Sequence, residues 1–196
     1  MNRIEKLLQK FCPDGVEFKA LGEVCDLTRG RVISQDYLRK NAGQYPVYSS
    51  QTKDNGIFGR INSFDFDGEY VSWTTDGANA GSVFYINEKF SVTNVCGLLK
   101  IKDSNLLNAK FLYFALCIKA KKYVNYSCGN PKLMSNKMAT IKIPIPPLEI
   151  QKEIVLILDA FTELEAELEA ELEAELQARQ KQYEHYRERL LSFDEL

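Results

Sequence analysis

The segment PDGVEFK, residues 13–19, contains the residue types with which metal-dependent nucleases cut DNA. That chemistry places two carboxylates on one divalent cation, usually from neighbouring strands. Asp14 and Glu17 lie three positions apart, so on an extended strand their side chains would point to opposite faces. An enzyme that uses Asp14, Glu17 and Lys19 is therefore kept as an alternative and not as the main interpretation.

Other catalytic patterns are incomplete. The segment DFDGE, residues 65–69, resembles part of a calcium loop but lacks the remaining ligand positions, and a hairpin turn explains it. His185 is the single histidine and has no candidate nucleophile near it in the sequence. We find neither a glycine-rich phosphate loop nor a motif that binds S-adenosylmethionine. We therefore expect no catalytic residue and no bound metal or cofactor in this chain.

Two polar loops, residues 48–60 and 73–81, carry side chains that can read the edges of bases. Asparagine and glutamine can make two hydrogen bonds to adenine, arginine and lysine bind guanine, and serine and threonine contact bases or phosphate. The segments 28–31 and 128–137 add cations and amides that we place near the same surface, although ordinary turns stay open as an alternative. The predicted DNA-binding residues are Arg29, Arg31, Ser50, Gln51, Thr52, Lys53, Asn55, Arg60, Thr74, Thr75, Asn79, Asn130 and Lys132.

The chain has two parts of opposite charge. Residues 1–148 contain 20 lysines and arginines against 13 acidic residues, whereas residues 149–196 contain 5 against 14. A basic part suits a polyanionic partner such as DNA, while phosphates would repel the acidic part. A mildly basic domain joined to a solvated helix is the alternative interpretation.

The composition favours a soluble cytoplasmic protein. The five cysteines form no CxxC pair and follow no secretory signal, which argues against disulfides and zinc ribbons. No apolar run approaches the roughly 18 residues of a membrane span, so we expect no membrane partner.

The basic part, residues 1–147, is predicted to fold as a β-rich domain. Segments 2–10 and 107–118 predict helices, and Lys119, Lys121 and Lys122 after the second helix suit either its C-terminus or a phosphate. Runs rich in β-branched and aromatic residues predict strands near 45–49, 57–61, 69–75, 81–86, 95–101 and 139–145. The predicted fold class is α+β, a mixed or antiparallel β-rich domain followed by one long C-terminal helix.

That helix is predicted to begin at Leu148, directly after a proline-rich extended segment, and to end near Leu191. Its apolar positions alternate four and three apart, as in a coiled coil, until the ELEA repeats of residues 163–178. Leucines four apart turn the stripe by about 40° per repeat, which favours contact with several helices. The predicted interface residues are Ile150, Ile154, Ile157, Phe161, Leu164, Leu168, Leu172, Leu176, Tyr183, Tyr186 and Leu190.

Taken together, these segments resemble specificity (S) subunits of type I restriction-modification systems. The resemblance covers essentially the whole chain, and its segments are FCPDGVEFKALGEV, YPVYSSQTKDNGIFGRI, GEYVSWTTDGANAGSVFY, IKIPIPPLEIQKEIVLILDAF, the ELEA repeats and YEHYRERLLSF. It implies a target-recognition domain that has no catalytic centre and binds half of a bipartite site in double-stranded DNA. It also implies methyltransferase subunits that methylate adenine at N6 with S-adenosylmethionine, and motor-nuclease subunits that use ATP and Mg²⁺.

Members of that family usually have two recognition domains and two long helices, whereas this sequence has one of each. It therefore resembles a half subunit, natural or truncated, that would form a homodimer through antiparallel helices and read a palindrome with an unspecified centre. In the family such repeats act as a ruler, because each unit adds about 6 Å of helix. A stand-alone homodimeric DNA-binding regulator and a coiled-coil protein indifferent to nucleic acid remain alternatives.

Overall fold

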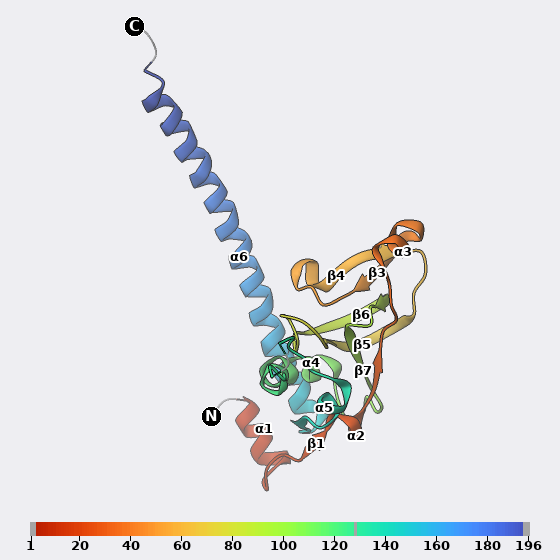
Figure 1. Ribbon diagram of the computed structural model, residues 1–196. Helices are drawn as coiled ribbons and strands as arrows, with labels where there is room; N and C mark the ends of the chain where they lie inside the picture. Colours follow the sequence, from red (N-terminus) through yellow and green to blue (C-terminus); the bar gives the residue numbers. More distant parts are fainter. Residues whose placement is uncertain (1–2, 128, 194–196) are drawn as a thin grey trace. The chain divides into compact units, whose positions relative to one another are not determined.

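The computed structural model describes residues 3–127 and 129–193, apart from the side chains of Lys53 and Asn55. The chain divides into two compact units, residues 1–155 and residues 156–196. Both the β-rich domain and the long helix are seen in Figure 1. The predicted α+β fold class is thereby confirmed.

The described residues of the first unit form short helices and eight strands. In chain order they are α1 (Arg3–Phe11), β1 (Phe18–Ala20), α2 (Leu21–Val24), β2 (Cys25–Arg29), α3 (Gln35–Lys40), β3 (Ala42–Tyr48), η1 (Lys53–Gly56), β4 (Ile57–Ile61), β5 (Phe66–Thr74), β6 (Val83–Val92), β7 (Cys96–Ile101), α4 (Ala109–Lys119), η2 (Ala120–Tyr123), α5 (Ser135–Ala139) and β8 (Lys142–Pro144).

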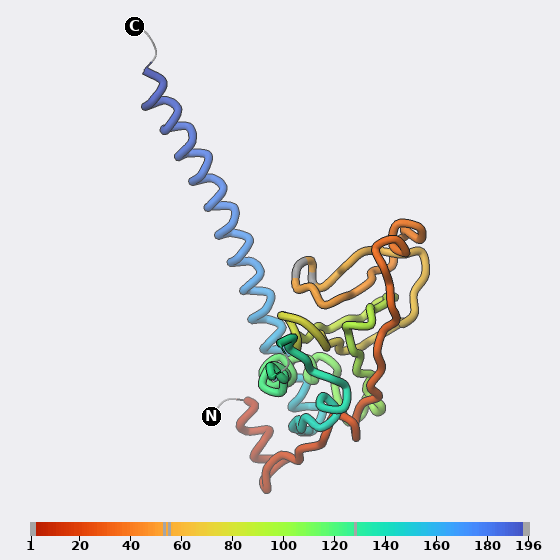
Figure 2. Tube along the Cα trace, in the orientation of Figure 1, coloured from red at the N-terminus to blue at the C-terminus, as the bar shows by residue number. Residues whose placement is uncertain are grey.

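The main sheet has the strand order β2-β7-β5-β6-β3-β4. All of its pairs are antiparallel except the short pairing of β3 with β6, so the sheet is mixed, as predicted. A second sheet pairs β1 with β8. The trace in Figure 2 follows the chain from α1 along one side of the domain to α3, where β3 begins.

The larger hydrophobic core lies where α4 and α5 pack against the sheet, around the fully buried Trp73. The Trp73 indole donates a hydrogen bond of 2.9 Å to the carbonyl of Leu133, which fixes the segment before α5. Gly97 lies under this ring, and a Cβ there would come within 2.2 Å of the Trp73 ring. A separate cluster of apolar residues contains Tyr48, Tyr70 and Phe90.

The long helix α6 (Leu148–Leu191) begins inside the first unit. Ile150 is fully buried, and Ile154 and Val155 pack against the core around Trp73. Gln151 is also fully buried; its amide donates to the carbonyls of Leu106 and Pro146 and accepts from the Asn108 amide. The compact unit therefore extends past the predicted boundary at residue 147, because the first two turns of the helix complete its core.

This packing corrects one prediction. Ile150 was expected at the interface with a second helix, but it is buried in the core of its own domain and has no surface to offer. The predicted apolar stripe is present and continues along α6 into the second unit. The first residues of the stripe pack against the domain that precedes the helix.

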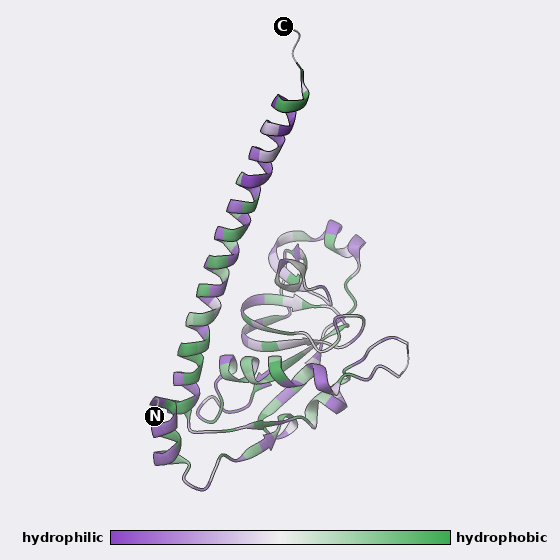
Figure 3. Ribbon diagram, turned by 90° about the vertical axis from the view of Figure 1, so that its left-hand side faces the viewer, coloured by the Kyte–Doolittle hydropathy of each residue, from purple (hydrophilic) through white to green (hydrophobic). Residues whose placement is uncertain are grey.

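From residue 156 onward α6 alternates apolar and charged residues along its length, as the colours of Figure 3 show. Among the helices within residues 3–127 and 129–193, none combines the length and apolar character that a membrane span requires.

Candidate nucleic-acid interface

The loops predicted to read bases lie together at one edge of the first unit. The amide of Leu133 donates to the carbonyl of Thr75 (2.8 Å), and the amide of Gly77 donates to that of Pro131 (3.0 Å). The amide of Thr75 in turn donates to the carbonyl of Val95 (2.9 Å). The loop after β5, the loop before β7 and the segment before α5 are therefore adjacent.

The loop between β3 and β4 joins the same surface. The Thr93 hydroxyl donates to the Ser49 hydroxyl (3.0 Å), and the Asn79 side chain donates to the carbonyl of Ser50 (3.0 Å). Gln51 holds this loop by an amide hydrogen bond to the carbonyl of Ile57. Side-chain amides have several hydrogen-bonding positions, so Gln51 and Asn79 can be fixed by one bond and still contact a base.

Arg29, at the end of β2, connects a fourth segment to these loops by hydrogen bonds. Its Nη2 donates to the Thr75 hydroxyl (2.7 Å), the Asn94 carbonyl (2.7 Å) and the Asp76 carboxylate (3.1 Å). Lys132 Nζ lies 3.9 Å from the other oxygen of Asp76. One carboxylate thus lies between two cations, and the cluster of Arg29, Asp76 and Lys132 keeps a net positive charge.

Arg31 is held by a separate set of partners. Its Nε donates to Asp65 (2.9 Å) and its guanidinium lies 5.0 Å from the centre of the Tyr37 ring. The hydrogen bond to Asp65, followed by that to the Tyr37 hydroxyl, raises the pKa of Arg31 above its ordinary value. Arg31 is therefore a permanent cation, but a phosphate would have to compete with Asp65 for it.

The remaining predicted residues divide by exposure. Ser50 is half-buried, whereas Thr52, Asn130 and Arg60 are exposed, the last donating to the carbonyl of Gln44 (2.8 Å). The predictions for the side chains of Lys53 and Asn55 lie outside the described residues.

The prediction that Thr74 and Thr75 contact bases is corrected by their burial. Both side chains are fully buried. The Thr75 hydroxyl donates to Asp76 and accepts from Arg29, so it supports the charged cluster from beneath. Thr74 Oγ1 has no hydrogen-bond partner among the described residues. These threonines face inward because the last five residues of β5, which ends at Thr74, are all buried and Thr75 continues from that end.

Gln151 was not among the predicted interface residues, and the pairing of Asp76 with two cations was not predicted. Asp76 lies in the polar loop of residues 73–81 that was predicted to read bases, and a lone acid among cations was the available signal for its different role. Gln151 lies between Ile150 and Ile154 on the buried face of α6, and a polar residue on that face was the available signal.

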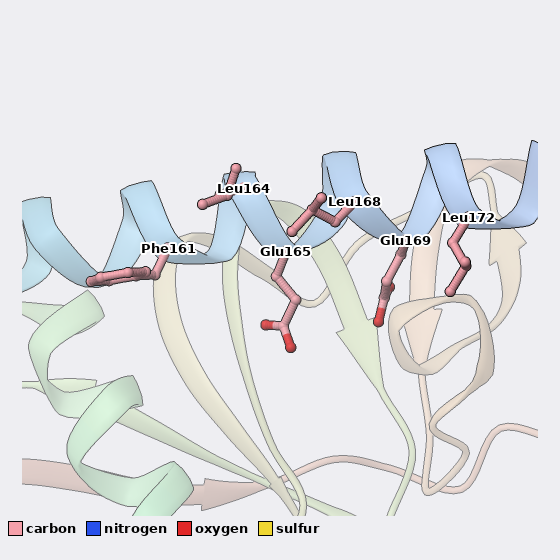
Figure 4. Close-up of a pocket in the computed structure, with 6 residues that line it drawn as sticks. All are labelled: Phe161, Leu164, Glu165, Leu168, Glu169 and Leu172. Carbon is pink, nitrogen blue, oxygen red and sulfur yellow. The ribbon is translucent and has the colours of Figure 1, made fainter.

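The second unit presents the other predicted surface. Phe161, Leu164, Leu168 and Leu172, with Glu165 and Glu169 beside them, line a shallow groove of about 450 Å³, drawn in Figure 4. These apolar side chains are 50–70% exposed. The side chains of Leu176, Tyr183, Tyr186 and Leu190 are also exposed, and Ile157 is less exposed, at 38%. A stripe of this size on one helix is typical of a surface that another chain covers.

The segment that resembled a nuclease motif contains an ion pair between two of its predicted residues. Lys19 Nζ pairs with Glu17 at 3.5 Å. Across residues 3–127 and 129–193, no group of three or more His, Cys, Asp or Glu side chains is arranged to hold a metal ion.

Comparison with known proteins gives consistent results. The family model for the type I restriction modification DNA specificity domain matches residues 13–178. A Mycoplasma pneumoniae protein named as type I specificity subunit S.MpnORF285P is 48% identical over 171 residues, which cover 87% of this chain and 56% of the relative. The specificity subunit of the type I restriction enzyme MpnII, from the same organism, is 44% identical over 171 residues, or 87% of this chain and 51% of the relative.

Solved structures agree in fold. The S subunit of the type I restriction-modification system of M. genitalium superimposes with a TM-score of 0.64 and 20% identity, over 92% of this chain and 47% of that chain. A type I restriction-modification complex gives a TM-score of 0.65 and 23% identity over 92% of this chain and 48% of that chain. The chain thus spans about half the length of most of the relatives described here.

Proposed function

Because the chain belongs to the family of type I restriction modification DNA specificity domains, we propose that it binds half of a bipartite DNA target and brings modification and cleavage subunits to it. The observation that carries this proposal is the meeting of four polar segments, from different parts of the sequence, on one edge of a basic domain. Such a surface combines cations for the phosphate backbone with amides for the base edges.

Within this surface the cations and the amides have different roles. Arg29, Arg31 and Lys132 supply positive charge at fixed positions and would bind phosphates, which contributes affinity without regard to sequence. Gln51 and Asn79 are fixed by hydrogen bonds to backbone carbonyls and would distinguish bases. Alanine at any of the three cations should weaken binding to all DNA, whereas alanine at Gln51 or Asn79 should change the preferred sequence.

The long helix would supply the second half of the assembly. Two copies of α6 packed antiparallel would cover the exposed stripe of Phe161, Leu164, Leu168 and Leu172 and would hold two recognition domains on one DNA. Support comes from the exposure of this stripe, since its four apolar side chains are 50–70% exposed on a single helix. The target of such a homodimer is a palindrome with an unspecified centre, and the helix length sets the gap.

Chemistry would come from the partner subunits. Methyltransferase subunits would use S-adenosylmethionine to methylate adenine at N6, and motor-nuclease subunits would use ATP and Mg²⁺. The glutamates that flank the leucines of α6 suit a protein partner better than DNA, because phosphates would repel them. This chain would then contribute sequence recognition and spacing, with no step of the reaction on its own residues.

The test compares the purified chain with its complex with a methyltransferase subunit of the same host. Fluorescence anisotropy would measure the binding of each to duplexes selected from a random pool. We expect selective binding by the complex and weak, non-selective binding by the chain alone. Tight selective binding by the chain alone would favour the regulator, and an absence of salt-dependent DNA binding in both samples would refute the proposal.

A further inference from the structure

A basic pocket lies beside the cluster of Arg29, Asp76 and Lys132. It has a volume of about 780 Å³ and is lined by Lys122, Tyr123, Val124, Asn125, Lys132, Met134, Asn136 and Lys137. Three of these residues are lysines and none is acidic. The pocket therefore favours an anion.

The walls of the pocket are fixed by the domain core. Val124, which lines the pocket, and Leu133 and Met138, which are sequence neighbours of lining residues, are buried in the core around Trp73. The backbones of Asn125 and Lys132 exchange two hydrogen bonds, of 2.8 and 3.0 Å, which join the two sides. A pocket that is formed before its ligand arrives loses little conformational entropy on binding.

The three lysines differ in what holds them. Lys132 Nζ lies 3.9 Å from Asp76 and so belongs to both the pocket and the charged cluster. Lys137 Nζ lies 5.5 Å from the centre of the Tyr123 ring, a contact that leaves its donors free for an anion. Lys122 is exposed. Lys119, the last residue of α4, by contrast donates to the carbonyl of Lys142 (2.8 Å) and does not line this pocket.

We propose that this pocket binds the sugar-phosphate backbone of double-stranded DNA next to the recognised half-site, with Lys122 and Lys137 as its phosphate contacts. The inference rests on the proposed function and extends its surface from the base-reading loops to η2 and α5. Continuity through Lys132 is what favours DNA over a free small anion. A duplex lying on the charged cluster would bring further phosphates to the adjoining lysines.

The experiment uses the complex with the methyltransferase subunit and a random-sequence duplex, titrated by fluorescence anisotropy at several salt concentrations. The variant is Lys122→Ala with Lys137→Ala. A matched control removes the same charge from α1, where Lys6→Ala and Lys10→Ala change two exposed lysines outside the pocket. A third variant, Lys122→Arg with Lys137→Arg, keeps the charge.

We expect the pocket variant to lower the slope of log affinity against log salt by about 2, since each lost phosphate contact removes about 0.9. The control and the arginine variant should stay close to the wild type, and all four proteins should melt at the same temperature. An unchanged slope in the pocket variant, or an equal loss in the control, would overturn the inference and leave the proposed function standing.

A second arm distinguishes the two sources of phosphate. Adenosine monophosphate and inorganic phosphate are added at constant ionic strength, and we expect neither to displace the duplex at millimolar concentration. Displacement by either compound that the pocket variant abolishes would identify a small-anion site and overturn the inference. Failure of the wild-type complex to bind any duplex would refute the proposed function and the inference together.

Discussion

Asp76 lies between Arg29 and Lys132, and in the proposed function this arrangement would determine how strongly the predicted base-reading surface attracts DNA in general. Its carboxylate takes up part of the positive field that the two cations would otherwise present to phosphates. It also fixes Arg29, together with the Thr75 hydroxyl and the Asn94 carbonyl. A carboxylate on a DNA-binding surface costs affinity, so in the proposed function Asp76 would orient the two cations and limit non-selective binding.

Asp76→Asn should therefore raise the affinity for random DNA by about tenfold at low salt and reduce the preference for the target. Asp67→Asn is the matched control, because Asp67 is exposed and pairs with Lys89 at 4.0 Å away from the loops. Anisotropy titrations on target and random duplexes measure both quantities. Weaker binding to random DNA would contradict this role for Asp76.

Two cysteines in the sheet give a prediction about pH. Burial raises the pKa of Cys25 and of Cys96 to about 12. Because these values lie above that of an exposed thiol, the buried thiols contribute stability that is complete below about pH 9 and is lost as the pH rises toward 12.

Only thiolates react with iodoacetamide, so native protein at pH 8.5 should be modified at Cys12 before Cys25 and Cys96. Mass spectrometry of the digested protein over time measures the order. The denatured protein is the control, in which all three cysteines should react at similar rates. Equal rates in the native protein would show that the sheet opens far more readily than this packing allows.

Gln151 holds the start of α6 to the domain that precedes it. Gln151→Leu would keep the volume but leave the Leu106 and Pro146 carbonyls and the Asn108 amide without their partner. We expect a loss of about 2–4 kcal/mol in the free energy of unfolding, measured with urea. Gln9→Leu, at an exposed position on α1, should change it little. A neutral effect of Gln151→Leu would mean that water replaces these bonds.

The bounds of helices and strands were predicted best where the sequence pattern was long or was limited by glycine or proline. Strand β4 (Ile57–Ile61) has the predicted bounds, and α6 begins at Leu148 because three prolines precede it and no glycine or proline interrupts it. Strands β1 and β2 were missed. β1 has three residues, and β2 alternates polar residues at the edge of the sheet, so neither has the apolar run that identifies an inner strand.

The same limit applies to the candidate site. The polar loops could be selected by residue type, but their meeting depends on strand pairs between distant segments, which local patterns do not encode. Thr74 and Thr75 were selected with them because the residue type alone does not tell whether a threonine at the end of a strand faces inward or outward. The stripe on α6 could not reveal that its first residues pack on their own domain.

The exposed part of that stripe predicts how α6 assembles. Replacing Leu164, Leu168 and Leu172 with alanine keeps the helix but removes the side chains that line the groove. We expect the homodimer to weaken by about two orders of magnitude, as measured by sedimentation velocity. Glutamine at Ala166, Ala170 and Ala174, on the opposite side of the helix, should leave it unchanged. Equal behaviour of the two variants would exclude the stripe as the dimer interface.

For the molecule as a whole, the two parts carry opposite charge and present different surfaces. The basic domain gathers cations and amides at one edge, and the acidic helix exposes an apolar stripe that DNA would not cover. Among the described residues of both parts, no group of three or more His, Cys, Asp or Glu side chains is arranged to hold a metal ion. The account therefore depends on two copies and on partner subunits to turn recognition into modification.

The central claim is that one chain provides both halves of the target by pairing with itself, with α6 as the spacer. The most direct measurement is co-expression with a methyltransferase subunit, followed by mapping of N6-methylated adenines across the genome, for the wild type and for a variant lacking residues 167–170. The account predicts two identical inverted half-sites around a fixed gap, and in the variant, whose helix is about 6 Å shorter, the same half-sites with a different gap. An asymmetric or continuous site, or an altered half-site in the variant, would contradict it.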